Sequence, residues 1–238
     1  MAYLRLLSVL LAVLFIPACA NQTAQPTVTP YRLARQATNT ELNLRVDVVG
    51  TAAGSGVVIS RSGHILTACH VACDSERLGI VLDEGGPYPF VYEAKLVATD
   101  KNWDLAVIKI DRKFRTTVKI ADPRTVRAGQ SVYSLGYPMD LGQITTRGTI
   151  TRTNYTFDFE GERENLHKML LIDLQTGPGH SGGPVFSSAN GDLVGIMHAI
   201  VSYGRRRRVF LKYTLATPAR KICSFLDAHE IPYDKRVP

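Results

Sequence analysis

Short apolar runs, separated by turns rich in glycine, proline and charge, recur along most of this 238-residue sequence. Runs of this length and spacing are typical of strands, and no helical period dominates before the C-terminal end. The nineteen glycines and twelve prolines supply the turns that such strands need. The sequence therefore predicts an all-β fold, and its length fits two small barrels or one modest domain.

The predicted strands fall into two sets of six. The first set comprises residues 42–49, 56–60, 64–69, 78–82, 91–99 and 105–110. The second set comprises residues 131–136, 143–154, 169–175, 184–186, 193–201 and 209–215. Residues 121–125 connect the sets, and residues 217–229 are predicted to form a terminal helix with Thr217 as N-cap and Pro218 at the first helical position.

The N-terminal residues 1–18 are excluded from this fold. Arg5 precedes the apolar run of residues 6–16, which is too short to span a bilayer and has the form of a secretory signal. The segment ending in Cys19 resembles a bacterial lipoprotein box, which would make Cys19 the lipidated N-terminus and tether the chain to a membrane. Cleavage after Ala20 is the open alternative. Residues 19–38 are polar and proline-bearing, and we expect them to form a flexible tether.

One serine lies in a segment built for a tight turn. The run Thr176-Gly177-Pro178-Gly179-His180-Ser181-Gly182-Gly183-Pro184 precedes a short apolar strand. Glycine on both sides permits a backbone conformation with positive φ and a close approach by another molecule. Such a turn presents the Ser181 hydroxyl outward and directs the N–H groups of Gly179 and Ser181 at one point, as an oxyanion hole requires.

A serine nucleophile needs a base, and the base needs an acid that orients it. His70 ends a predicted strand, and Asp104 opens the apolar strand 105–110. The chain order His70, Asp104, Ser181 is that of the chymotrypsin arrangement. Asp100 is a rival acid, but it lies in a polar turn, and the rival base His64 lies at the beginning of its strand.

These motifs make the chain similar to the trypsin-like (chymotrypsin-fold) serine proteases, in the style of the Deg-type bacterial branch without a PDZ domain. The matching segments are residues 54–59, 66–71, 104–109, 126–138, 178–184 and 191–196. The resemblance implies a protease domain over residues 39–238 with two six-stranded antiparallel β-barrels, the first about 39–122 and the second about 123–216, followed by the C-terminal helix. It also implies a serine endopeptidase acting on proteins or peptides without a cofactor, in the periplasm or cell envelope.

The resemblance assigns a role to each member of the triad. Ser181 would attack the scissile carbonyl, His70 would move the proton, and Asp104 would hold the imidazole. His180 departs from the aspartate or asparagine usual at its position in the family. An aspartate there pairs with a newly freed N-terminus in digestive members, so His180 argues against that activation switch. A non-catalytic binding protein that kept the fold is the alternative function.

The substrate pocket is predicted from alignment to the same motif. Its base is expected near Gln175 and Thr176, and its walls are expected from Met197, His198, Ala199, Ile200, Phe210 and Tyr213. The absence of a carboxylate among these residues disfavours cleavage after lysine or arginine, and the apolar walls favour a small or aliphatic side chain. His198 could instead recognise an acidic residue or hydrogen-bond near Asp104.

Charge and cysteine content set further limits. The formal net charge is +7, with four arginines at residues 205–208, which fit either a solvated turn or an anionic partner. No aromatic interleaving or nucleic-acid module accompanies them, so binding to DNA or RNA is not expected. With Cys19 lipidated, Cys69, Cys73 and Cys223 allow one disulfide at most, and a zinc site at Cys69, His70 and Cys73 is disfavoured by its spacing.

Overall fold

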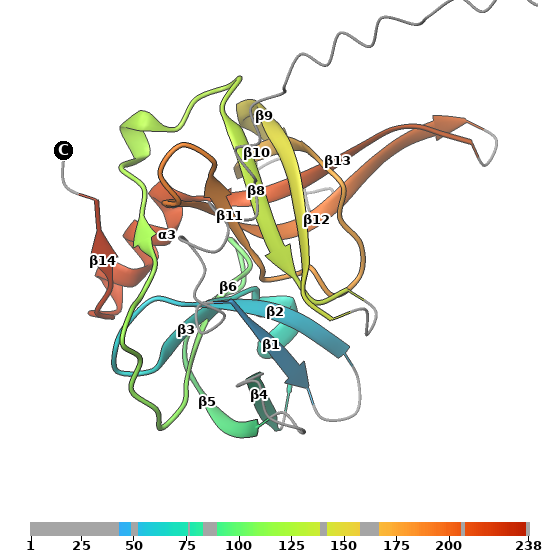
Figure 1. The fold of residues 1–238 in the computed structure, drawn as a ribbon. Coiled ribbons are helices and arrows are strands. Elements are labelled where there is room, and N and C mark those ends of the chain that lie inside the picture. The colour runs from blue at the N-terminus through green and yellow to red at the C-terminus, as the bar shows by residue number, and fades with distance from the viewer. Residues whose placement is uncertain are drawn as a thin grey trace, which may run out of the picture.

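The computed structural model describes residues 43–48, 52–75, 77–82, 90–138, 142–157, 167–205 and 208–236. The predicted signal segment 1–18, the lipidation site Cys19 and the tether 19–38 lie outside these ranges. Within them, no helix combines the length and the apolar character that crossing a bilayer requires. The described chain forms two stacked groups of strands with a helix at their junction (Figure 1).

The first group of strands closes into a six-stranded antiparallel barrel in the order β1-β2-β3-β6-β5-β4. Its strands are β1 (Asn43–Val48), β2 (Ala52–Val58), β3 (His64–Thr67), β4 (Leu78–Leu82), β5 (Phe90–Asp100) and β6 (Leu105–Lys109). Strand β6 is apolar on both faces, and all of its residues except the last are buried in the core. The predicted first barrel is therefore confirmed.

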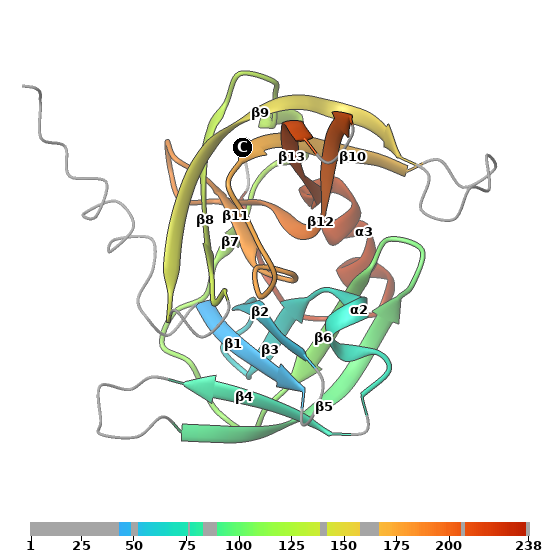
Figure 2. The same ribbon diagram turned by 90° about the vertical axis from the view of Figure 1, so that its right-hand side faces the viewer.

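The second group forms a sheet in which six antiparallel strands also close, since β11 pairs with both β8 and β12. These strands are β8 (Ser131–Gly136), β9 (Ile144–Phe157), β10 (His167–Leu174), β11 (Pro184–Ser187), β12 (Leu193–Arg205) and β13 (Arg208–Pro218). Two short strands that the sequence did not predict, β7 (Lys119–Ile120) and β14 (Asp234–Lys235), add to this sheet in parallel. Figure 2 shows β9 arching over the top of this half. The all-β double-barrel prediction is confirmed.

The terminal helix α3 (Ala219–Ala228) is present, but its predicted cap was wrong. Strand β13 continues through Pro218, and Pro218 is the N-cap residue, without a side-chain hydrogen bond to the helix. The Thr217 hydroxyl donates instead to the carbonyl of Trp103 at 2.9 Å. That bond joins β13 to the segment before β6, so a tertiary contact takes the hydroxyl that the local sequence pattern assigned to the helix.

The predicted strand ending at His70 was also too long. Strand β3 ends at Thr67, and Cys69–Ala72 form the one-turn helix α2, which carries His70. The Cys69 N–H donates to the carbonyl of Asp104 at 3.1 Å, so the chain leaves the sheet where it meets the segment before β6. The connection between the barrels includes β7 and the short 3-10 turn η1 (Pro123–Thr125), whose first N–H groups are capped by Asp122.

One hydrophobic core runs through both barrels. It joins the interior strands of the first barrel to Phe186 of β11, to Ile196 of β12 and to the buried face of α3, which contributes Ile222 and Leu226. A second cluster fills the interior of the second barrel. Because the larger cluster crosses the junction, we expect the two barrels to unfold together rather than one at a time.

Phe186→Ala is expected to lower the free energy of unfolding by about 3–5 kcal/mol, because Phe186 is fully buried and its removal leaves a cavity at the junction. Denaturant unfolding followed by circular dichroism measures this change. Val91→Ala is the matched control, since Val91 is 69% exposed, and it should change stability by less than about 0.5 kcal/mol. Two separate transitions in the wild-type protein would contradict the shared core.

Candidate active site

Asp104 lies at the end of a tight turn that directs its side chain across the junction of the barrels. Its φ of 52° is in the left-handed region, which aspartate tolerates better than most residues. The rival acid Asp100 opens the same turn and accepts the Trp103 N–H at 3.1 Å. Asp100 is therefore committed to shaping the turn, and Asp104 is the carboxylate that the turn presents.

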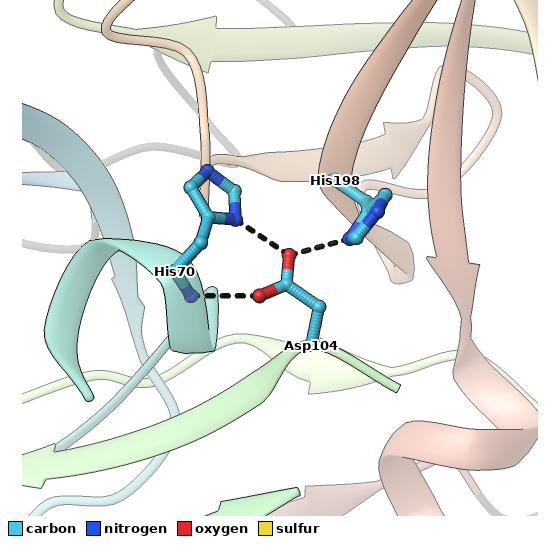
Figure 3. A group of neighbouring side chains, drawn as sticks. All are labelled: His70, Asp104 and His198. Carbon is cyan, nitrogen blue, oxygen red and sulfur yellow. Dashed lines mark hydrogen bonds and ion pairs between the residues drawn. The ribbon is translucent and has the colours of Figure 1, made fainter. Parts of the chain in front are cut away.

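His70 lies directly against this carboxylate. The His70 Nδ1 and Asp104 Oδ2 are 2.7 Å apart, and the His70 backbone N–H donates to Asp104 Oδ1 at 2.7 Å. Figure 3 shows the ring with its second nitrogen turned away from the acid. The rival base His64 contacts the hydroxyls of Ser60 and Ser62 instead. The two-point contact fixes the ring plane of His70, as a general base requires.

Ser181 follows a turn whose type is defined by its hydrogen bond and its glycine. The His180 N–H donates to the Gly177 carbonyl at 3.1 Å, Pro178 occupies the second position, and Gly179 has φ of 93° at the third. This combination is a type II turn. In a type I turn the Pro178–Gly179 peptide would be rotated by about 180°, and the Gly179 N–H would point the opposite way. The positive φ of Gly179 therefore determines the direction of this N–H.

The N–H groups of Gly179 and Ser181 donate no hydrogen bond within the described part of the chain. Both N–H groups therefore remain available as hydrogen-bond donors, as the predicted oxyanion hole needs. Among the described residues, the Ser181 hydroxyl makes no hydrogen bond to His70. Such a bond is commonly long before substrate binds.

Ser55 of β2 fastens this turn to the first barrel. Its hydroxyl donates to the Gly179 carbonyl at 2.7 Å and accepts the Tyr137 N–H at 3.1 Å. Its backbone N–H donates to the Ser181 carbonyl at 2.8 Å. Ser55 is fully buried, so these bonds are shielded from water. One residue of the first barrel therefore fixes the carbonyl groups of Gly179 and Ser181, the residues on either side of His180.

Close packing adds to this attachment. Gly182 has φ of 76°, and a Cβ there would lie 2.2 Å from the Thr67 hydroxyl and 2.8 Å from the Ala68 nitrogen. A Cβ on Gly54 would lie 2.6 Å from the Val71 side chain and 3.1 Å from the Ser181 carbonyl oxygen. The serine turn therefore contacts the segment between β3 and α2 through positions that only glycine fits. This contact brings the serine segment against the helix that carries His70.

A second histidine reaches Asp104 from the other barrel. His198 lies in β12 at a register shift between Met197 and Ala199, where one extra residue interrupts the pairing with β13. Such a bulge re-aims a side chain. The His198 Nδ1 hydrogen-bonds Asp104 Oδ2, the oxygen that also faces His70 (Figure 3). The two imidazole rings meet edge to face, with centroids 6.0 Å apart.

These contacts keep Asp104 ionised despite its burial. Burial raises the pKa of the Asp104 carboxyl, but the hydrogen bonds from His198 and His70, together with their electrostatic attraction, outweigh burial and lower the pKa to about 2. The carboxylate is therefore charged at any pH at which a histidine base operates. Its negative charge can stabilise a positively charged imidazole.

His180 lies beneath the turn, 4% exposed, where its Nδ1 faces the N–H and carbonyl of Gly177. Its Nε2 is buried without a hydrogen-bond partner among the described residues. Burial lowers its pKa, which the nearby Lys212 lowers further against the raising effect of the Gly177 contact. Burial therefore favours the neutral form of the His180 imidazole.

A cavity of about 170 Å³ opens beside Ser181. Five predicted pocket residues line it: Thr176, Met197, His198, Ala199 and Ile200. The sequence did not predict the other lining residues, which are Gly177, Pro178, His180, Ser181 and Thr214. At one end the hydroxyls of Thr176 and Thr214 are 2.7 Å apart, and Thr214 also donates to the Leu174 carbonyl. None of the described residues that line the cavity carries a carboxylate.

Two predicted pocket residues lie elsewhere. Gln175 is exposed and does not line the cavity, because alternation along the end of β10 turns Thr176 inward and Gln175 outward. Tyr213 packs with Met169, Leu171 and Leu215 in a separate apolar cluster. The side chain of Phe210 is outside the described part of the structure.

The cysteines near the site form a disulfide. Cys69 and Cys73 are bonded, which removes both thiolates from the zinc site that the sequence analysis disfavoured, and Cys223 is a buried free thiol. His70, Asp104 and His198 bring ligand-type atoms within 4.8 Å of one another. In this structure the Nδ1 atoms of both histidines hydrogen-bond the carboxylate. We therefore interpret the three residues as a hydrogen-bonded group.

Ser55 is the functional residue that sequence reasoning missed. It lies within the segment 54–59 that supported the family resemblance, but its role depends on contacts with residues more than 80 positions away. Ser55→Ala is expected to lower kcat roughly 10–100-fold with little change in KM, because the oxyanion donors lose their alignment while the pocket is kept.

Steady-state kinetics on a peptide substrate, with circular dichroism as a folding check, measures this effect. Ser187→Ala is the matched control, since Ser187 is also a buried serine and its hydroxyl accepts the Ala189 N–H rather than a group of the serine turn. It should leave kcat within about twofold of the wild-type value. Equal kcat for Ser55→Ala and wild type would show that Ser55 does not position the turn.

Comparison with known proteins agrees with this geometry. The family model described as trypsin-like peptidase domain matches residues 54–196. A DegP-like periplasmic serine endoprotease of Pseudomonas putida is 32% identical over 165 residues, which are 69% of this chain and 32% of the relative. A protein of the same description from Brucella suis is 36% identical over 153 residues, which are 63% of this chain and 28% of the relative.

The chain thus spans about a third of the length of these relatives. The matched residues 54–196 contain His70, Asp104 and Ser181 with the turn around it, and the fold has the two barrels between which these residues lie. The chain belongs to the trypsin-like peptidase family.

Proposed function

We propose that this protein is a serine endopeptidase that uses Ser181, His70 and Asp104. The observation that carries the proposal is the two-point hydrogen bonding of His70 by Asp104 beside a type II turn that keeps the Gly179 and Ser181 N–H groups as donors. The relatives are described as serine endoproteases, which supports the same activity.

Each group has one task in this mechanism. The Ser181 Oγ attacks the scissile carbonyl carbon while its proton passes to His70 Nε2. The carbonyl oxygen becomes an oxyanion that accepts hydrogen bonds from the Gly179 and Ser181 N–H groups. His70 then gives the proton to the leaving amine, and an acyl-enzyme remains until water, activated by the same base, hydrolyses it. Asp104 stays ionised throughout and stabilises the imidazolium.

The cavity beside Ser181 supports cleavage after small or aliphatic residues. Met197, Ala199 and Ile200 give it apolar walls, and the hydroxyls of Thr176 and Thr214 are already hydrogen-bonded to each other. The described lining residues include no carboxylate that could pair with a lysine or arginine side chain, whose unpaired buried charge would be costly.

We also propose that the protein acts in the periplasm or cell envelope, held by a lipid on Cys19. The sequence pattern of residues 1–19 supports export, and the relatives are described as periplasmic. The Cys69–Cys73 disulfide is consistent with an oxidising compartment.

Ser181→Ala is expected to abolish peptide cleavage and to leave the fold intact, because the substitution removes one half-buried oxygen atom. A fluorophosphonate probe should label the wild-type protein and not the variant. Cleavage by the variant at the wild-type rate would overturn the assignment of the nucleophile. A folded wild-type protein that resists the probe would favour a non-catalytic binding role.

Cleavage of a peptide library is expected to occur mainly after alanine, valine and other small or aliphatic residues. Ala199→Asp places a carboxylate in the wall and should shift cleavage toward lysine and arginine. Val91→Asp is the matched control, because Val91 is exposed on the first barrel and does not line the cavity. Dominant wild-type cleavage after arginine or after glutamate would contradict this preference.

A further inference from the structure

His198 is hydrogen-bonded directly to Asp104, and it is linked to His70 and to the Ser181 segment through neighbouring residues. The residue before it, Met197, accepts the Gly182 N–H at 2.9 Å and donates to the Gly183 carbonyl at 2.9 Å, so β12 is bonded directly to the segment after Ser181. His198 then bonds Asp104, and Asp104 bonds His70. This path runs from the nucleophile in the second barrel to the acid and base in the first.

The carboxylate serves two imidazoles through one oxygen. Asp104 Oδ2 accepts from His70 Nδ1 and from His198 Nδ1, and both rings lie close to it. The His70 side chain is 47% exposed, whereas the His198 side chain is 13% exposed. The single negative charge of Asp104 can compensate one imidazolium. Once one of the two histidines is protonated, its positive charge repels a proton on the other.

From this geometry we infer that His198 is a positioning residue that aligns Asp104 from the second barrel, and that protonation of His198 suppresses catalysis. The inference rests on the proposed endopeptidase function and adds to it a regulation by pH. In the acylation step His70 must gain a positive charge. When His198 already carries one, Asp104 no longer stabilises the His70 imidazolium as well, and the barrier rises.

The other charged and titratable groups around His198, among the residues that the structure describes, are cationic or neutral. His70 faces it from α2, and the pocket wall that it shares carries His180. On β13, Lys212 donates to the Thr176 carbonyl of that wall, and Tyr213 lies nearby in the sequence. Lys221 of α3 lies over the Trp103 ring. Among these described groups Asp104 is the one carboxylate, and it bonds both histidines.

The direction of the pH effect follows from counting protonated forms. If the active form has both imidazoles neutral, protonation of either one removes activity as the pH falls. A substitution that removes the ionisable group of His198 but keeps the hydrogen bond to Asp104 leaves only the protonation of His70. The acid midpoint of kcat/KM should then move to lower pH, by about 0.3 pH unit for two equivalent sites and by more if His198 protonates first.

The test compares three substitutions at this position. Asparagine places its amide nitrogen where His198 Nδ1 lies, so His198→Asn keeps the donor and loses the ionisation. Glutamine places its amide nitrogen where Nε2 lies, so His198→Gln is the matched control that loses the donor to Asp104. We expect His198→Gln and His198→Ala to lower kcat roughly 10–100-fold at pH 8, and His198→Asn to restore most of it.

The pH profile separates positioning from a purely structural role. His198→Asn should retain a larger fraction of its activity at pH 6 than the wild-type protein does. Coincident wild-type and His198→Asn profiles would overturn the regulatory part, and equal kcat for His198→Gln and wild type would overturn the positioning part. A wild-type protein without Ser181-dependent cleavage would instead refute the proposed function. Should His198→Ala and His198→Gln fail to fold, the His198→Asn profile still decides.

Discussion

The Asp104 carboxylate is the group around which the two barrels are arranged. It is a buried anion on a backbone with positive φ, and both features cost free energy. Three hydrogen bonds offset this cost: two come from His70 in the first barrel, and one comes from His198 in the second. A buried charge tolerates little displacement of its partners, so the need to satisfy this one restricts how the barrels can sit against each other.

The serine turn imposes the reciprocal constraint. Ser181 belongs to the second barrel, but its carbonyl and that of Gly179 are bonded by Ser55 of the first. Each barrel thus holds a functional segment of the other: β12 holds the acid, and β2 holds the nucleophile. Ser55 and Asp104 are both buried, which strengthens hydrogen bonds that would be weak at a solvated interface.

The strands were predictable from sequence because each one is a local apolar run bounded by turn residues, and the nucleophile turn was predictable because its glycines are required locally. What failed depends on contacts distant in sequence. Thr217 has the chemistry of a helix cap, but Trp103 takes its hydroxyl. The bulge at His198 arises from pairing with β13, so strand alternation alone could not show that this side chain reaches Asp104. Gln175 was placed in the pocket by alignment, one residue off the inward face.

The buried His180 clarifies how the serine turn keeps its shape. Burial lowers the pKa of its imidazole and favours the neutral form. The turn is held by the His180 N–H to Gly177, by the Gly183 N–H to His180 and by Ser55. Neutral hydrogen bonds of this kind are insensitive to ionic strength. The turn is thus held by neutral groups, whereas the Asp104 carboxylate is a buried anion that both barrels must satisfy, one through His70 and the other through His198.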